Sequence, residues 1–536
     1  MKPQSFLKGS LLLGLSALTA KLLGALFKIP LTSLLGGTGM GYFSCAYGLF
    51  LPLYAVFVTG LSTAVARPAA ACAARGDIAG ALRIRQVARR LFLAGGLGGM
   101  LLALLCAKPF ALYTAESPEA FPAVLAIAPA VLFSCLTAVE RGFHEGLCSM
   151  YPTAVSQAIE ALCKLLCGLW FCHLVMEAPE LPPFLAGYSR EGLAAAAAVL
   201  GVTVSTAAGW LCTLLFSAGA KNVQPSRTVP ASSVIKTLFS VMIPVALGSL
   251  VTNLTSLIDL VTVIRSLNDR LNADPAAFYE GTSLSSEILP KDAAAFVYGS
   301  YMGLSVTVFN IVPALTNMFG KGVLPCTAQA WARGERAKAA EYAGQVLVLT
   351  AIAAAPAGCG IFALSKGILE FLFAGKTAEI AAACDGLHGL SAGLVFLCLA
   401  FPVFSILQAI GKAGIPVKIM LVGTVVKLAG NLLLIPSLYT AGAALSTSLS
   451  YAVILVLALL ALHRELGEML HLGKPLLCIV YAALMCGAAA WLAYSRLLPY
   501  LPQRPALLAA IAAGGAVYLL VLFLGMGREL KEMLKS

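Results

Sequence analysis

Charged side chains inside long apolar runs are the residues of this sequence most able to carry chemistry. They are Lys21, Lys28, Glu160, Lys164, Asp259 and Lys427. A charged residue at the centre of a membrane-spanning helix costs about 2.5–3.5 kcal/mol on insertion scales, so such residues rarely face lipid. We therefore expect these side chains to line a hydrated cavity or to pair with one another.

The spacing of these residues indicates which of them act together. Lys21 and Lys28 are seven residues apart and share a helix face, although Lys28 also lies near the end of its run, where its ammonium group can snorkel to the interface. Glu160 and Lys164 have the i, i+4 spacing and the order that favour an ion pair within one helix. A structural pair and a substrate contact both remain open for these two residues.

The other two charges stand in different surroundings. Asp259 follows a polar stretch that contains Asn253, and its candidate partners are a lysine of the first half of the chain, a cation or a proton. Lys427 has no charged neighbour within its run, which favours a functional role.

The balance of these charges predicts an anionic substrate, because the lysines outnumber the carboxylates. An ammonium group 4 Å from a phosphate oxygen gains roughly 4 kcal/mol at an effective dielectric constant of 20. Lysine is a point charge rather than a bidentate fork, which suits a diphosphate that must be released again. The predicted substrate-binding residues are Lys21, Lys28, Lys164, Lys427, Glu160, Asp259 and Asn253.

The composition shows which elements must position these residues. The chain has 536 residues, of which 60% are hydrophobic and 11% are charged. Soluble domains are roughly half apolar and a quarter charged, so a soluble enzyme, a disordered chain and a nucleic-acid binder are excluded. Since about 20 mostly apolar residues span a bilayer, we predict an all-α polytopic membrane protein with fourteen spans. The spans cover residues 9–29, 42–66, 90–107, 121–139, 152–175, 193–217, 237–263, 294–318, 345–364, 386–410, 415–435, 440–462, 475–495 and 506–526.

The basic residues between these spans predict their orientation. With the N-terminus in the cytoplasm, most of the lysines and arginines fall on the cytoplasmic side, and an even number of spans returns the C-terminus there. The first span also resembles a signal peptide, but its apolar sequence continues past Lys21, which favours a transmembrane helix. Residues 265–292 form a long acidic outer loop to which no role is assigned. The 15 cysteines lie almost all in spans or at cytoplasmic ends and predict free thiols.

An internal repeat relates the two halves of the chain. Residues 74–79 and 332–337 share the pattern A-R-G-acid-x-A at an offset of 258 residues, and a weaker match relates Lys164 to Lys427 at an offset of 263. We predict two pseudo-symmetric lobes of six helices with the same orientation. Their boundaries are 1–220 for the N-terminal lobe, 221–464 for the C-terminal lobe, and 465–536 for two further helices and a cytoplasmic tail. Such lobes leave a cleft near the bilayer midplane, and their rocking gives alternating access.

Short motifs along nearly the whole chain resemble a known family in their order and spacing. They are Ser5–Gly9, Lys21–Gly24, Gly39–Tyr42, Gly60–Ala66, Ala74–Asp77, Arg141-Gly142, Met150–Pro152, Ser156-Gln157 with Glu160, and Leu407–Ala409 with Gly414 and Pro416. This pattern resembles the stage V sporulation protein B branch of the polysaccharide transporters. That branch belongs to the multidrug/oligosaccharidyl-lipid/polysaccharide (MOP) flippase superfamily.

The resemblance implies a flippase that moves an undecaprenyl-diphosphate-linked saccharide across the cell membrane by alternating access. The implied cargo is a peptidoglycan or polysaccharide precursor, such as one for the spore cortex. Family members tend to carry arginine at the positions of Lys21 and Lys28, so this chain keeps the charge but loses the bidentate geometry. The last two spans are expected to extend a groove for the prenyl tail.

Two other classes of function compete with this interpretation. A MATE-type drug antiporter, coupled to a cation, needs carboxylates for ion exchange, and carboxylates are the minority here. A membrane enzyme such as a prenyl phosphotransferase needs clustered acidic residues to hold magnesium, and no adjacent Asp pair occurs. We therefore expect that the protein is not an enzyme and that it binds no cofactor or metal. The expected partners are a lipid-linked anionic substrate, membrane lipid and a coupling ion, H⁺ or Na⁺, and no nucleic acid.

Overall fold

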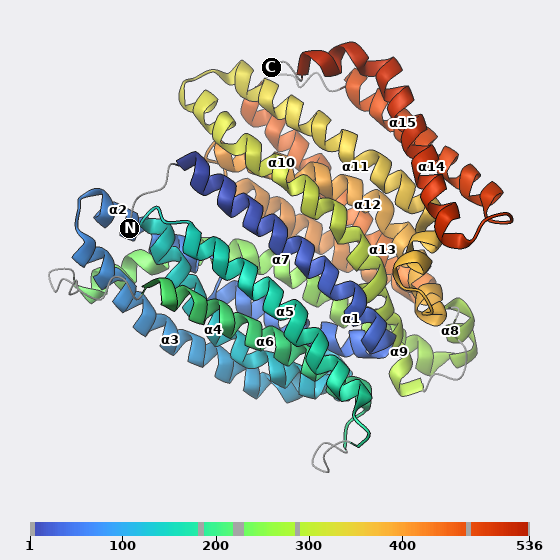
Figure 1. The fold of residues 1–536 in the computed structure, drawn as a ribbon, viewed down its shortest axis with the longest axis horizontal. Helices are drawn as coiled ribbons and strands as arrows, with labels where there is room; N and C mark the ends of the chain where they lie inside the picture. The colour runs from blue at the N-terminus through green and yellow to red at the C-terminus, as the bar shows by residue number, and fades with distance from the viewer. Residues whose placement is uncertain are drawn as a thin grey trace. The chain divides into compact units, whose positions relative to one another are not determined.

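The computed structural model describes residues 6–180, 187–217, 230–282, 284, 290–467 and 473–533 (Figure 1). In this part of the chain the regular elements are all helices, which confirms the predicted all-α class. They are α1 (Phe6–Phe57), α2 (Leu61–Ala74), α3 (Ile78–Pro109), η1 (Phe110–Thr114), η2 (Pro118–Ala120), α4 (Phe121–Gly146), α5 (Tyr151–Glu177), α6 (Arg190–Ser217), α7 (Ala231–Ala273), α8 (Pro275–Gly281), α9 (Pro290–Ser300), η5 (Tyr301–Ser305), α10 (Val306–Ala332), α11 (Arg336–Leu372), α12 (Thr377–Ala409), α13 (Gly414–Leu466), α14 (Gly473–Leu497) and α15 (Gln503–Met533).

Twelve helical segments of the described chain are long and apolar enough to cross a membrane. Every predicted span overlaps one of them, because the segments over residues 19–74 and 414–466 each take up two spans. The first predicted span begins earlier than its segment, at residue 9, and the second runs past the end of α1 into α2. The prediction of an outer loop over residues 265–292 is wrong in part. Residues 265–273 continue α7 and residues 275–281 form α8.

Helix α1 is a hairpin whose two arms meet at Gly36. This glycine has φ 65°, a left-handed conformation that costs a residue without a Cβ little energy. The rings of Phe27 and Phe43 lie 6.3 Å apart, whereas sixteen residues of straight helix would separate them by about 24 Å. The chain therefore folds back on itself between the two predicted spans.

Helix α13 is a second hairpin, which turns at Tyr439 with φ 49°. Ser450 Oγ in its second arm donates to the carbonyl oxygen of Gly423 in its first arm at 2.7 Å. Each arm of α13 contains one predicted span, whereas the span predicted over residues 42–66 covers the second arm of α1 and continues into α2. The number of membrane crossings itself stays a prediction, since helix length and composition alone do not place a bilayer.

The helices gather into two compact units. Unit 1 comprises residues 1–265 and 291–299, and unit 2 comprises residues 266–290 and 300–536. The predicted lobe boundary at residues 220 and 221 lies outside the described residues. The division into two lobes and a two-helix extension therefore stays a prediction.

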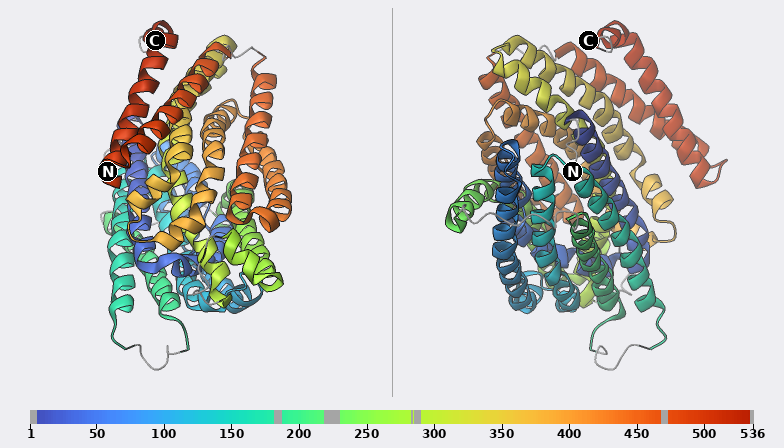
Figure 2. Two further views of the ribbon diagram at one scale, coloured as in Figure 1. Left: turned by 90° about the vertical axis from the view of Figure 1, so that its right-hand side faces the viewer. Right: turned by 60° about the vertical axis from the view of Figure 1, so that its left-hand side comes forward.

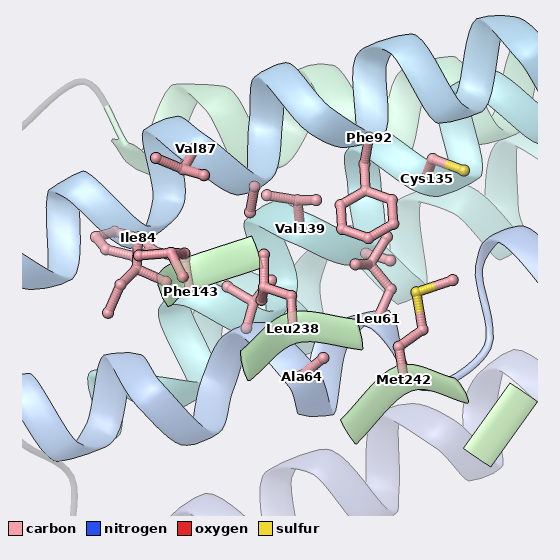
Figure 3. Close-up of a cluster of buried hydrophobic side chains, with 14 of the residues drawn as sticks. Leu61, Ala64, Ile84, Val87, Phe92, Cys135, Val139, Phe143, Leu238 and Met242 are labelled. Carbon is pink, nitrogen blue, oxygen red and sulfur yellow. The ribbon is translucent and has the colours of Figure 1, made fainter. Parts of the chain in front are cut away.

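In unit 1, α1, α4, α5 and α6 pack against one another, and α3 packs on α4 (Figure 1). A hydrophobic core joins α2, α3, α4 and α7, where Phe92, Val139 and Leu238 interdigitate (Figure 3). Because helices with one apolar stripe bury it against neighbours, this core holds α4 against α2, α3 and α7.

In unit 2, α10, α11, α12 and α13 pack together around a core that includes Leu407 and Ala458. Helices α14 and α15, which contain the last two predicted spans, form a pair that packs against α11 (Figure 2). Leu477 and Leu524 of this pair are exposed, as expected for side chains that a bilayer covers.

The helix ends of the two units repeat at the predicted offset. In the loops of residues 74–79 and 332–337 the same pattern of backbone hydrogen bonds closes the turn. Residues with left-handed φ recur in order at the ends of corresponding helices: Gly76, Glu116 and Cys148 in unit 1, and Gly334, Gly375 and Gly411 in unit 2. Gly36 and Gly60 in unit 1, and Tyr439 and Gly467 in unit 2, also have left-handed φ but no counterpart at this offset, so the backbone repeat is limited to these three turns.

Candidate functional site

Helix α5 carries charged side chains on one face and exposed apolar side chains on the opposite face. Leu162, Leu166 and Trp170 are exposed. At 3.6 residues per turn, they lie on the side of the helix away from Glu160 and Lys164. A bilayer that covers the apolar face would leave the charges directed into the protein.

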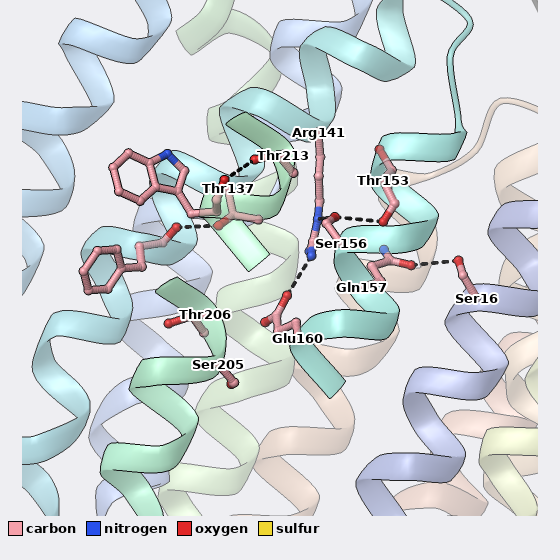
Figure 4. A network of polar contacts seen from close by, with 12 residues as sticks. Ser16, Thr137, Arg141, Thr153, Ser156, Gln157, Glu160, Ser205, Thr206 and Thr213 are labelled. Carbon is pink, nitrogen blue, oxygen red and sulfur yellow. Dashed lines mark hydrogen bonds and ion pairs between the residues drawn. The ribbon is translucent and has the colours of Figure 1, made fainter. Parts of the chain in front are cut away.

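Glu160 does not form the predicted ion pair with Lys164. Its carboxylate instead binds Arg141 of α4, with 2.7 Å between Nη2 and Oε2 (Figure 4). Arg141 also donates through Nε to Ser156 Oγ at 2.8 Å. Of the two alternatives that the spacing left open, the pair within α5 is therefore not formed, because the guanidinium of the adjacent helix offers Glu160 a charged, fork-shaped donor.

Lys164 is held by aromatic side chains of α1. Its Nζ donates to Tyr47 Oη at 3.0 Å and lies 5.3 Å from the ring centroids of both Phe27 and Tyr47. Cation–π contacts of this length are favourable and leave part of the ammonium shell unused. The side chain is half-buried, so a ligand can still reach it.

A cavity of about 320 Å³ lies beside these residues, between α1 and α5. Gln157, Glu160, Ala161 and Lys164 of α5 form one wall, and small residues of α1 form the other. Ser16 Oγ of α1 donates to Oε1 of the lining residue Gln157 at 3.0 Å (Figure 4). Sequence reasoning predicted Glu160 and Lys164 here but assigned no role to Gln157, which appeared only within a motif.

Lys21 and Lys28 of α1, which were predicted to bind the substrate, do not line this cavity. The ammonium groups of Lys28 and Lys164 are near enough to repel each other. Lys21 is exposed and lies on the same helix face as Lys28, as the spacing predicted. Lys28, Lys164 and Arg141 outnumber Glu160, so this region of unit 1 carries a net positive charge.

The predicted residues of α7 lie elsewhere in unit 1. Asn253 Nδ2 donates to the carbonyl oxygen of Ser249 at 2.9 Å and to Ser249 Oγ at 3.1 Å. Asp259 is buried, with 9% of its surface exposed. Neither residue lines the cavity between α1 and α5.

Lys427 belongs to unit 2, in the first arm of α13, and only 4% of its surface is exposed. Val425 and Leu432 are exposed on the opposite side of this arm. Asn431, one turn further on, accepts a hydrogen bond from Ser446 Oγ of the second arm. Lys427 therefore points into the interior of its unit, toward a polar seam of the hairpin.

A second cavity, of about 490 Å³, lies in unit 2 between α11, α12 and α14. Phe362, Leu484 and Trp491 are among its lining residues, and all three side chains are well exposed. The cavity is thus an apolar groove on a helix surface of the kind that a hydrocarbon chain fills. Within the described residues, no group of three or more His, Cys, Asp or Glu side chains is arranged to hold a metal ion.

Comparison with known families agrees with this architecture. The family model described as polysaccharide biosynthesis protein matches residues 6–336, which is more than half of the chain. The chain belongs to the polysaccharide biosynthesis protein family. A second model, described as lipid II flippase MurJ, matches residues 277–504.

Two curated relatives come from Bacillus subtilis (strain 168). The lipid II flippase MurJ is 23% identical, over 96% of this chain and 94% of its own length. Stage V sporulation protein B is 22% identical, over 83% of this chain and 81% of its own length. The resemblance to the stage V sporulation protein B branch, predicted from short motifs, is confirmed.

Solved structures show the same fold. The lipid II flippase MurJ in an inward closed conformation has a TM-score of 0.62 and 14% identity, and the match covers 92% of this chain and 98% of that one. An inward-facing multidrug resistance MATE transporter of the MOP superfamily also has a TM-score of 0.62, with 13% identity, covering 84% and 94%. The family is therefore one of multi-pass membrane flippases and transporters rather than enzymes, as predicted.

Proposed function

We propose that this protein translocates an undecaprenyl-diphosphate-linked saccharide across the cell membrane. The observation that carries the proposal is the position of Lys164. Its ammonium group lies beside a cavity with Gln157 and Glu160, on the face of α5 opposite the exposed apolar face, in a region with net positive charge. An ammonium at bilayer depth attracts a phosphorylated group and can release it again.

The prenyl tail of such a substrate needs a separate, apolar surface. The groove between α11, α12 and α14 supplies one, and its exposed Phe362 and Trp491 offer large apolar faces. Since lipid tails are as apolar as this surface, the groove would hold the prenyl tail through van der Waals packing and not through removal from water. The expectation that the last two spans extend a tail groove is supported by the part that α14 plays in this groove.

The proposed mechanism is alternating access, with both termini in the cytoplasm and the membrane potential or a coupling ion, H⁺ or Na⁺, as the driving force. An inside-negative potential favours outward movement of an anion by about 2.3 kcal/mol per charge per 100 mV. The cargo we propose is a peptidoglycan or polysaccharide precursor, including one for the spore cortex. The relatives named lipid II flippase and stage V sporulation protein B support this assignment.

A cation-coupled drug antiporter is the second candidate, because MATE transporters share the fold. Antiport requires a carboxylate that exchanges its ion during the cycle. Glu160 is bound by Arg141 at 2.7 Å, so it is poorly placed for this task, whereas the buried Asp259 of α7 is the carboxylate that such an antiporter would use. Drug efflux from vesicles driven by an ion gradient would favour the antiporter over the flippase.

The test is a flipping assay in liposomes that contain the purified protein and undecaprenyl-diphosphate-linked saccharides. We expect Lys164→Ala to lower the translocation rate by tenfold or more, since loss of one ammonium–phosphate contact of about 1.4 kcal/mol already gives a factor of ten. Lys338→Ala is the matched control, because Lys338 is an exposed lysine paired only with Glu335 at 3.1 Å. Equal rates for both variants and the unaltered protein would exclude the proposed role of Lys164.

A further inference from the structure

We propose that the cavity between α1 and α5 is a subsite for the sugar ring joined directly to the diphosphate, with Lys164 at its phosphate end. This inference rests on the function proposed above and gives the bound headgroup a direction. It assigns roles to Gln157 and to the small residues of α1.

The order of polar groups along α5 sets this direction. Gln157, Glu160 and Lys164 follow one another at about one turn each, so an amide, a carboxylate and an ammonium group form a row about 10 Å long. An amide and a carboxylate suit the hydroxyl and acetamido groups of a sugar, whereas an ammonium group suits phosphate. The sugar therefore lies toward Gln157 and the diphosphate toward Lys164.

Both sugar-binding side chains are held in place before a ligand arrives. Ser16 donates to Gln157 Oε1 at 3.0 Å, which directs the amide and leaves Nε2 as the donor for a ligand. Arg141 binds Glu160 Oε2 at 2.7 Å, which fixes the carboxylate and leaves Oε1 as an acceptor. Such preorganisation lowers the entropy cost of binding.

The opposite wall has room for a ring. It consists of Ala20 and Gly24, and a Cβ atom added to Gly24 would meet nothing within 4 Å. Since Ser16 contacts Gln157 and Phe27 lies over Lys164, α1 runs alongside α5 in the same direction, and Ala20 faces the middle of the row. The volume of about 320 Å³ is at the small end for ligand sites, which favours one ring over a longer glycan.

The experiment measures binding of two lipids to the purified full-length protein in detergent. One is undecaprenyl diphosphate, and the other is the same lipid carrying a single N-acetylglucosamine. We expect Gln157→Ala and Ala20→Leu each to weaken binding of the sugar-bearing lipid about tenfold and to leave binding of the sugar-free lipid unchanged, because the first removes a hydrogen bond and the second fills the ring position.

The controls separate this proposal from the function on which it rests. Ala94→Leu makes the same change at an exposed position of α3 and should alter neither affinity. Only the subsite is refuted if Lys164→Ala weakens binding of both lipids while the Gln157→Ala and Ala20→Leu variants bind the sugar-bearing lipid as tightly as the unaltered protein. The proposed function fails, and the subsite with it, if the unaltered protein binds neither lipid. It also fails if the Lys164→Ala variant binds both lipids as tightly as the unaltered protein.

Discussion

Glu140 and Arg141, which are adjacent in α4, form ion pairs with two different helices and so connect three helices of unit 1. Arg141 binds Glu160 of α5, while Glu140 binds Arg85 of α3 with 2.6 Å between Oε2 and Nη2. Arg85 also lies 5.0 Å from the ring centroid of Phe143. Glu140 is 1% exposed and Arg85 is 14% exposed, so removal of Glu140 leaves a largely covered guanidinium without its carboxylate.

We therefore expect Glu140→Ala to lower the free energy of unfolding by about 3–5 kcal/mol, the range for breaking a buried ion pair. Glu465→Ala is the control, because its partner Lys412 is half exposed and such surface pairs contribute less than about 1 kcal/mol. Unfolding of the purified variants by denaturant in detergent measures both effects. Similar losses for the two variants would show that the pair between α3 and α4 contributes no special stability.

Residues of the cavity differ in how visible they are in the sequence. Glu160 and Lys164 are found easily because a charge in an apolar run is costly and therefore conspicuous. Arg141 follows the apolar run of residues 121–139, where a basic residue indicates a cytoplasmic flank. Only the packing of α4 on α5 brings Arg141 to Glu160. Gln157 is neutral, so a hydropathy profile does not single it out.

At the scale of elements, hydropathy predicts the helices well because only a helix or a closed barrel satisfies backbone hydrogen bonds in lipid. The hairpin turns at Gly36 and Tyr439 both fall in gaps that the sequence predicted between spans, at residues 30–41 and 436–439. The repeated turns are clearer in the backbone than in the sequence. Cys148 and Gly411 both have left-handed φ, 56° and 81°, at the ends of corresponding helices.

This correspondence predicts opposite effects of substitution in the two units. A left-handed conformation costs an L-residue roughly 1–2 kcal/mol, and the exposed Cys148 buries no side chain that would offset this cost. We expect Cys148→Gly to stabilise the protein by up to about 1 kcal/mol and Gly411→Ala to destabilise it by about the same amount. The midpoint of thermal unfolding in detergent should therefore rise for the first variant and fall for the second.

Cys148→Ala is the matched control for this prediction. It removes the thiol and keeps a Cβ atom in the left-handed conformation, so the midpoint should stay near that of the unaltered protein. A rise in midpoint for Cys148→Ala as large as that for Cys148→Gly would attribute the gain to loss of the thiol instead of relief of backbone strain.

At the scale of the whole molecule, the direction of transport depends on which ends of the helices face the cytoplasm. The proposed orientation follows from the distribution of lysine and arginine between the spans. The two cysteines that are exposed in the structure, Cys148 and Cys326, both lie at helix ends assigned to the cytoplasmic side. Tyr500, between α14 and α15, is 85% exposed and lies at an end assigned to the outer side.

A maleimide that cannot cross membranes tests this orientation with the natural thiols. We expect Cys148 and Cys326 to stay unlabelled in intact cells and to react in inverted membrane vesicles, because only the vesicles present the cytoplasmic face to the reagent. The variant Tyr500→Cys should show the reverse pattern and gain a label at residue 500 in intact cells. Peptide mass spectrometry assigns each label to its residue. Labelling of Cys148 in intact cells would show that the orientation is opposite to the one proposed. The direction of movement proposed for the cargo would then be inward.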